Sequence, residues 1–131
     1  MDTLDKNGHI SCVIFDLDNT LVGIPNLGHY IRGVLLDCLL QEYDVTLEDP
    51  NDSFKLFTSG KGHTAVLESW GVNDSSNFWE IFDKYDFEKR QSMYNKRELY
   101  VYDDVLSCLE TIKSTGLKLA VASNTANFIA N

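Results

Sequence analysis

The chain has 131 residues, a length that suits one ordinary domain with its own hydrophobic core. Its formal net charge of -9 argues against a nucleic-acid or anionic-membrane surface, because either partner would be repelled. No apolar run approaches membrane-spanning length, and the first residues lack the basic start of a secretory signal. Cys12, Cys38 and Cys108 fall among apolar neighbours, which indicates small core residues in a reducing compartment. We therefore expect a cytoplasmic protein.

A short apolar segment opens the interpretable part of the chain. Residues 10–15 read Ile-Ser-Cys-Val-Ile-Phe, which predicts a strand buried on both faces, as in a parallel sheet. The next five residues are Asp16, Leu17, Asp18, Asn19 and Thr20, and the Asp and Asn residues among them favour a turn. The strand is therefore predicted to end at Asp16.

The middle of the chain is predicted to be mostly helical. Apolar residues recur every three or four positions from Leu27 to Leu39, which predicts a helix with one buried face. Residues 53–59 and 64–70 suit shorter helical pieces, the second closed by Gly71. A further amphipathic helix is predicted to begin near residues 74–77, with Phe78, Ile81, Phe82 and Tyr85 on one face.

Extended structure returns near residues 100–102, before a helix that runs from Asp103 to its end at Gly116. Residues 117–122 then read as a second short strand, followed by the polar turn Ser123-Asn124-Thr125. A helix between two strands predicts a right-handed crossover with parallel, neighbouring strands. The predicted fold class is therefore α/β.

The carboxyl ends of parallel neighbouring strands lie at the same edge of a sheet, where open α/β sheets bind their ligands. Asp16 and Asp18 follow the first predicted strand, and Ser123 and Asn124 follow the second. Two carboxylates brought together repel each other unless a cation or a proton lies between them. Mg²⁺ prefers oxygen ligands and would also neutralise a phosphate held by Ser123. The sequence therefore predicts a magnesium and phosphate site at this edge.

These two segments resemble the first two signatures of the haloacid dehalogenase superfamily. The first is an apolar strand followed by Asp16-Leu17-Asp18-Asn19-Thr20-Leu21-Val22, and the second is Ala120-Val121-Ala122-Ser123-Asn124. The resemblance implies a Rossmann-like parallel-sheet core formed by residues 1–22 and 100–131, with a helical cap inserted as residues 23–99. It also implies a phosphoglycolate-phosphatase-like hydrolase that acts on a small phosphorylated metabolite.

The resemblance further implies a role for each site residue. Asp16 would be the nucleophile, and its carboxylate would also bind Mg²⁺, to which Asp18 would contribute its backbone carbonyl as a ligand. Asp18 would be the general acid and base, which favours a phosphatase over a dehalogenase because halide leaves without a proton. Thr20 would tie down the catalytic loop, and Ser123 and Asn124 would contact the phosphoryl group or the substrate.

The sequence departs from the family pattern after Ser123. Members of the family normally add a lysine and further acidic metal ligands, but residues 124–131 contain no Lys, Asp or Glu. We therefore expect an incomplete core in which a two-stranded sheet exposes edges that favour self-association. A non-catalytic remnant or interaction protein of the same fold, and a phosphomutase of the same superfamily, stay open as alternatives.

Overall fold

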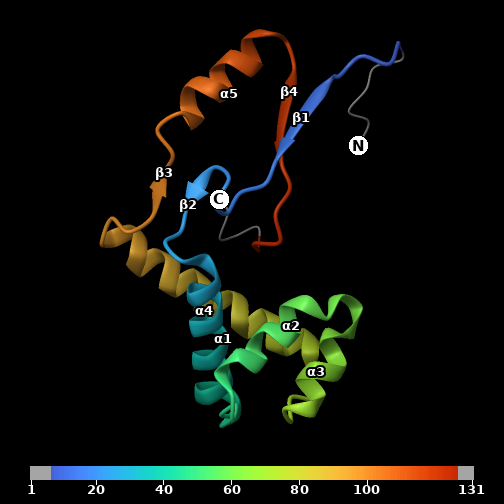
Figure 1. The fold of residues 1–131 in the computed structure, drawn as a ribbon, viewed down its shortest axis with the longest axis vertical. Coiled ribbons are helices and arrows are strands. Elements are labelled where there is room, and N and C mark those ends of the chain that lie inside the picture. Colours follow the sequence, from blue (N-terminus) through green and yellow to red (C-terminus); the bar gives the residue numbers. More distant parts are fainter. Residues whose placement is uncertain (1–6, 127–131) are drawn as a thin grey trace. The chain divides into compact units, whose positions relative to one another are not determined.

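The computed structural model describes residues 7–126 (Figure 1). The chain divides into two compact units: a helical unit, Asn26–Asn95, and a sheet unit formed by the segments before Asn26 and after Asn95. The predicted core also included residues 1–6 and 127–131, which lie outside the described residues. The assignment of the two units as catalytic core and cap stays a prediction.

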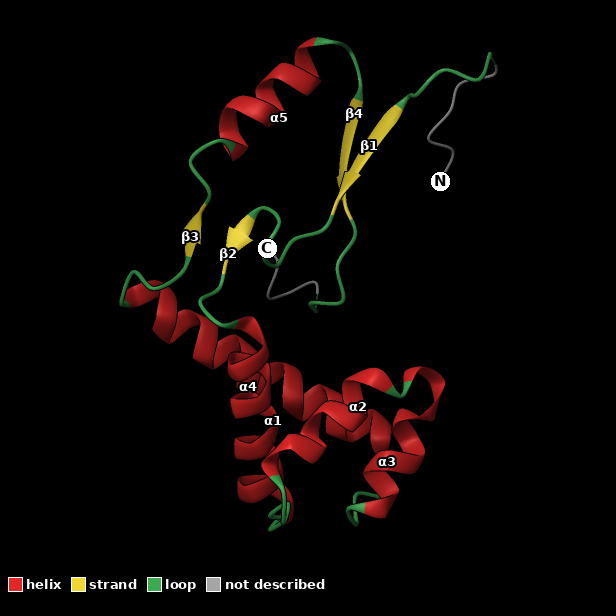
Figure 2. Ribbon diagram, in the orientation of Figure 1, coloured by secondary structure: helices red, strands yellow, loops and turns green. Residues whose placement is uncertain are grey.

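The sheet unit contains the predicted parallel pair. Strands β1 (Cys12–Phe15) and β4 (Lys118–Val121) lie side by side, from the pair Cys12 and Lys118 to the pair Phe15 and Val121 (Figure 2). Helix α5 (Val105–Ser114) precedes β4 and contacts it. The prediction of an α/β fold with a parallel sheet is confirmed.

A second, shorter strand pair lies close to the points where the chain passes between the units. Strands β2 (Val22–Gly23) and β3 (Tyr100–Val101) pair in antiparallel fashion. The Tyr100 ring packs so closely on Gly23 that a Cβ atom at this position would collide with it. A larger residue at position 23 would therefore require the Tyr100 ring to move. β3 confirms the extended structure predicted near residues 100–102, whereas β2 was not predicted, because two residues are too few for an alternating pattern.

The expectation that the first strand is buried on both faces is wrong. Ile14 of β1 is 42% exposed and Val121 of β4 is 54% exposed. Leu106 of α5 is 67% exposed, and α5 has no buried residue. Within residues 7–126 the parallel sheet has two strands, which cannot bury apolar side chains on both faces. Self-association through this surface stays a prediction.

The helical unit contains every helix expected in the middle of the chain. Its elements are α1 (Leu27–Tyr43), η1 (Pro50–Ser53), α2 (Phe54–Thr58), η2 (Gly60–Gly62), α3 (His63–Ser69) and α4 (Ser75–Asn95). The Asn26 side chain caps α1 by accepting a hydrogen bond from the His29 amide, and the Asp74 side chain accepts one from the Asn77 amide at the start of α4. No helix of residues 7–126 combines the length and the apolar character needed to cross a membrane.

The core of the helical unit lies largely where α1 packs against α4. The buried side chains of α1 are Tyr30, Val34, Leu35, Cys38 and Leu39, and those of α4 include Phe78 and Phe82. This burial confirms the predicted apolar faces. It also raises the pKa of the Cys38 thiol to about 11, so Cys38 stays protonated at neutral pH. Cys12 is buried as expected, but Cys108 is exposed because α5 has no buried face.

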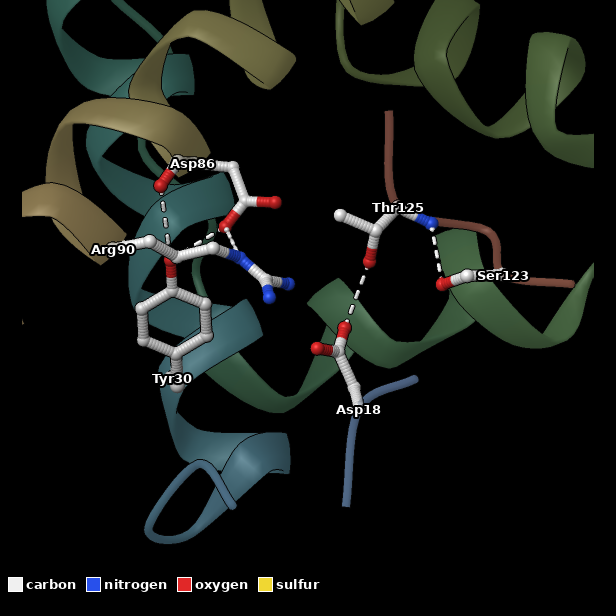
Figure 3. Close-up of polar contacts among 6 residues, drawn as sticks. All are labelled: Asp18, Tyr30, Asp86, Arg90, Ser123 and Thr125. Carbon is white, nitrogen blue, oxygen red and sulfur yellow. Dashed lines mark hydrogen bonds and ion pairs between the residues drawn. The ribbon is translucent and has the colours of Figure 1, made fainter. Parts of the chain in front are cut away.

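A buried polar cluster, formed by Tyr30, Asp86 and Arg90, joins α1 to α4 (Figure 3). The Tyr30 hydroxyl donates to Asp86 Oδ1, and Arg90 Nε donates to the same oxygen at 2.8 Å. The Arg90 guanidinium lies 5.6 Å from the centre of the Tyr30 ring. Burial, helped by the neighbouring Asp86, raises the pKa of Tyr30 above its usual value, which keeps its hydroxyl a donor.

Candidate active site

The two predicted signature segments leave the sheet at the same end. β1 and β4 are parallel neighbours, and the Ala122 amide donates to the Phe15 carbonyl at 2.8 Å, one step beyond the last strand pair. Asp16 follows Phe15 directly, and Ser123 follows Ala122. The structure therefore brings Asp16 and Ser123 to one edge of the sheet, as the predicted crossover requires.

The segment after β1 is a tightly wound turn. The Leu17 carbonyl accepts hydrogen bonds from the amides of Leu21 and Val22 at 2.9 and 3.1 Å, and a longer one from Thr20 at 3.2 Å. Asn19 adopts a left-handed backbone conformation (φ 57°), which Asn tolerates better than most residues. Its side-chain oxygen accepts a hydrogen bond from the Ile24 amide at 3.0 Å. Asn19 had no predicted role, and the structure shows that it stabilises the turn carrying Asp18.

A direct hydrogen bond links the two segments. The Thr125 hydroxyl donates to Asp18 Oδ2 at 2.8 Å, and the Thr125 amide donates to Ser123 Oγ at 3.1 Å (Figure 3). Asp18 and Thr125 are both half-buried. The polar turn that contains Thr125 could be predicted from the sequence, but no role for Thr125 could, because a contact across 107 positions leaves no local pattern.

The other predicted site residues lie on the exposed rim. Asp16, Thr20, Ser123 and Asn124 all have exposed side chains. The Thr20 hydroxyl lies 3.5 Å from Asp16 Oδ2, at the outer limit of a hydrogen bond, so it restrains the carboxylate only weakly. Asn124 forms no hydrogen bond within the described part of the chain, and its predicted substrate contact stays a prediction.

The donor set at this edge suits a hard divalent cation in part. Asp16 and Asp18 supply carboxylate oxygens, which Mg²⁺ prefers, and Mg²⁺ commonly takes one or two carboxylates together with waters and substrate phosphate. Residues 7–126 contain no group of three or more His, Cys, Asp or Glu side chains placed to hold a metal ion. Asp16 and Asp18 are thus the acidic residues that this edge offers, and the Asp18 backbone carbonyl stays the predicted second ligand.

Comparison with known proteins agrees with this architecture. Among solved structures, the chain is similar to a predicted phosphoglycolate phosphatase from Haemophilus somnus 129PT, with a TM-score of 0.50 and 18% sequence identity. The match covers 98% of this chain and 55% of the solved one, so the chain spans about half the length of that structure. At this identity the likeness shows the fold alone. A comparison with curated proteins gave no match.

The fold and the signature segments define a parallel α/β protein with its polar site beyond the carboxyl ends of two strands. The sequence model of the family described as "Haloacid dehalogenase-like hydrolase" matches residues 13–130, nearly the whole chain. The chain therefore belongs to the haloacid dehalogenase-like hydrolase family.

Proposed function

We propose that this site belongs to a Mg²⁺-dependent phosphatase that hydrolyses a small phosphorylated metabolite through an aspartyl-phosphate on Asp16. The observation that carries the proposal is the meeting of the Asp16 and Ser123 segments at one sheet edge, joined by the Thr125 to Asp18 hydrogen bond. Family membership and the fold of the solved phosphatase structure support a hydrolase of this kind. Free thiols at Cys12, Cys38 and Cys108 fit a cytoplasmic location.

The proposed reaction has two steps. An Asp16 oxygen attacks phosphorus, the bond from phosphorus to the ester oxygen breaks, and protonated Asp18 gives its proton to the departing alkoxide. Asp18, now a carboxylate, then removes a proton from the water that attacks phosphorus. The bond from phosphorus to Asp16 breaks, which releases inorganic phosphate and restores both aspartates. The Ser123 hydroxyl donates a hydrogen bond to a phosphoryl oxygen in both steps.

Mg²⁺, held by the Asp16 carboxylate and the Asp18 backbone carbonyl, would supply positive charge that offsets the phosphoryl oxygens and the Asp16 carboxylate. An acidic chain has particular need of it, because its own net charge of -9 repels a phosphorylated substrate. Asp18 favours phosphoester cleavage over carbon–halogen cleavage, since an alkoxide leaving group needs a proton and halide does not. A phosphomutase would use the same pair and differ in what accepts the phosphoryl group.

A second candidate is a non-catalytic protein of the same fold that kept the two signature segments. The observation that favours it is the small donor set: two carboxylates, with no third acidic ligand and no lysine beside them in the signature segments. The two candidates differ in one measurable property, which is metal-dependent release of phosphate.

Phosphate release from a panel of phosphorylated metabolites tests the proposal. We expect the full-length product of the gene to release inorganic phosphate from at least one of phosphoglycolate, sugar phosphates and nucleoside monophosphates, with millimolar Mg²⁺ present. EDTA should stop the release and added Mg²⁺ should restore it. Hydrolysis that persists in EDTA would contradict the Mg²⁺ requirement. No hydrolysis of any ester would favour the non-catalytic protein.

A further inference from the structure

Thr125 forms hydrogen bonds to a residue of each signature segment (Figure 3). Its hydroxyl donates to Asp18 Oδ2 at 2.8 Å, within the usual range for a hydroxyl and a carboxylate. Its backbone amide donates to Ser123 Oγ at 3.1 Å. The predicted general acid and the predicted phosphoryl contact are therefore tied to the same residue.

Each of these bonds restricts the orientation of a reacting group. A threonine hydroxyl has a single hydrogen to donate, and here it is directed at Asp18 Oδ2. Because the carboxyl group is planar, fixing one oxygen also fixes where the other can lie. At Ser123 the incoming amide hydrogen occupies one lone pair of Oγ, so the hydroxyl hydrogen of Ser123 must point away from the Thr125 nitrogen.

The two bonds differ in what produces them. An amide that donates to a Ser hydroxyl two residues earlier is a common local turn and by itself indicates no function. The Asp18 bond joins residues 107 positions apart, from the turn after β1 to the turn after β4. A local turn preference does not produce such a bond, because the two segments meet only through the fold.

We propose that Thr125 is a positioning residue, whose hydroxyl holds the Asp18 carboxyl group in one rotamer. The consequence for the reaction rests on the proposed function, in which Asp18 moves the proton. The positioning itself is a property of this chain and can be measured without turnover. The hydrogen bond from the Thr125 backbone amide to Ser123 does not depend on the side chain at position 125. Variants at this position therefore test the effect of the hydroxyl alone.

The rotamer of Asp18 tests the proposal directly. Three-bond couplings to the Asp18 side-chain carboxyl carbon, measured by NMR on the isotope-labelled chain, report its χ1 angle. We expect one rotamer in the wild type and in Thr125→Ser, which keeps the hydroxyl, and a changed or averaged χ1 angle in Thr125→Val, which replaces the hydroxyl with a methyl group. A single, unchanged rotamer in Thr125→Val would overturn the proposal, as would averaging in Thr125→Ser.

The amide spectrum of each variant shows whether it is folded. If Thr125→Val does not fold, Thr125→Ala replaces it. Averaged couplings at Asp18 in the wild type would overturn the proposal whatever the variants do. The NMR measurements do not depend on catalysis. If the protein hydrolyses no phosphate ester, the proposed function is contradicted, but the χ1 angle of Asp18 still tests the positioning role of Thr125.

The effect on turnover gives a second measurement in the protein that hydrolyses phosphate. We expect Thr125→Val to lower kcat by about tenfold to a hundredfold, because misplacing a general acid costs rate in the chemical step. The KM should change by less than about twofold, since Thr125 holds the acid and not the substrate. Thr125→Ser should recover most of the lost kcat. A rise in KM at unchanged kcat would show that Thr125 acts in binding, which would overturn its proposed role.

Discussion

Asp16→Asn is expected to abolish phosphatase activity, lowering kcat by roughly four orders of magnitude or more. The amide of asparagine is a poor nucleophile and carries no negative charge, so both the attack on phosphorus and the predicted contact with Mg²⁺ are lost. Because the Asp16 side chain is exposed, the replacement should leave the fold intact. Phosphate release from the best substrate of the metabolite panel measures the effect.

A matched control makes the same chemical change elsewhere in the sheet unit. Asp104 is also exposed, and its side chain makes no capping hydrogen bond at the start of α5. Asp104→Asn removes the same charge and should keep the wild-type kcat within about a factor of two. Equal activity in Asp16→Asn and Asp104→Asn would show that phosphoryl transfer does not pass through Asp16.

Asp86→Ala is expected to lower the free energy of unfolding of the helical unit by about 3–5 kcal/mol. Asp86 and Arg90 are 4% and 8% exposed, so removing the carboxylate takes the Asp86 ion pair away from a buried guanidinium. The Tyr30 hydroxyl loses its carboxylate acceptor in the same variant. Both tryptophans, Trp70 and Trp79, lie in this unit, so urea denaturation followed by tryptophan fluorescence reports its stability.

Asp37→Ala is the control for this experiment, because Asp37 also forms an ion pair between α1 and α4. Its carboxylate lies 3.2 Å from Lys89 Nζ, but the two side chains are 61% and 40% exposed. Solvent screens such a pair, so its loss should cost less than about 1 kcal/mol. Equal decreases in the free energy of unfolding for Asp37→Ala and Asp86→Ala would mean that burial does not make the Asp86 ion pair more stabilising than the exposed one.

Most of the secondary structure could be predicted from local patterns. The helix from Leu27 is clear in the sequence because its apolar residues repeat at helical spacing, and these residues are the buried face of α1. The two strands of the sheet could be predicted from short apolar runs that end in polar turns. Their parallel pairing followed from the helix between them.

The remaining features depend on contacts between distant residues. Asp86 and Arg90 occupy the buried side of α4, where an apolar pattern predicts no charge, and Tyr30 on α1 supplies their partner. Thr125 meets Asp18 only once β1 and β4 are paired. The exposure of Ile14 was missed because a buried strand and an uncovered one have the same apolar sequence.

The central claim is that Asp16 and Asp18, together with the segment containing Ser123, form one magnesium site at the sheet edge. Titration of the labelled chain with Mg²⁺, followed through its backbone amide signals, tests this claim most directly. We expect saturable shifts confined to residues 16–20 and 122–125, which are lost in Asp16→Asn and kept in Asp104→Asn. Shifts that lie elsewhere on the acidic surface, or that are the same in Asp16→Asn as in the wild type, would contradict the claim.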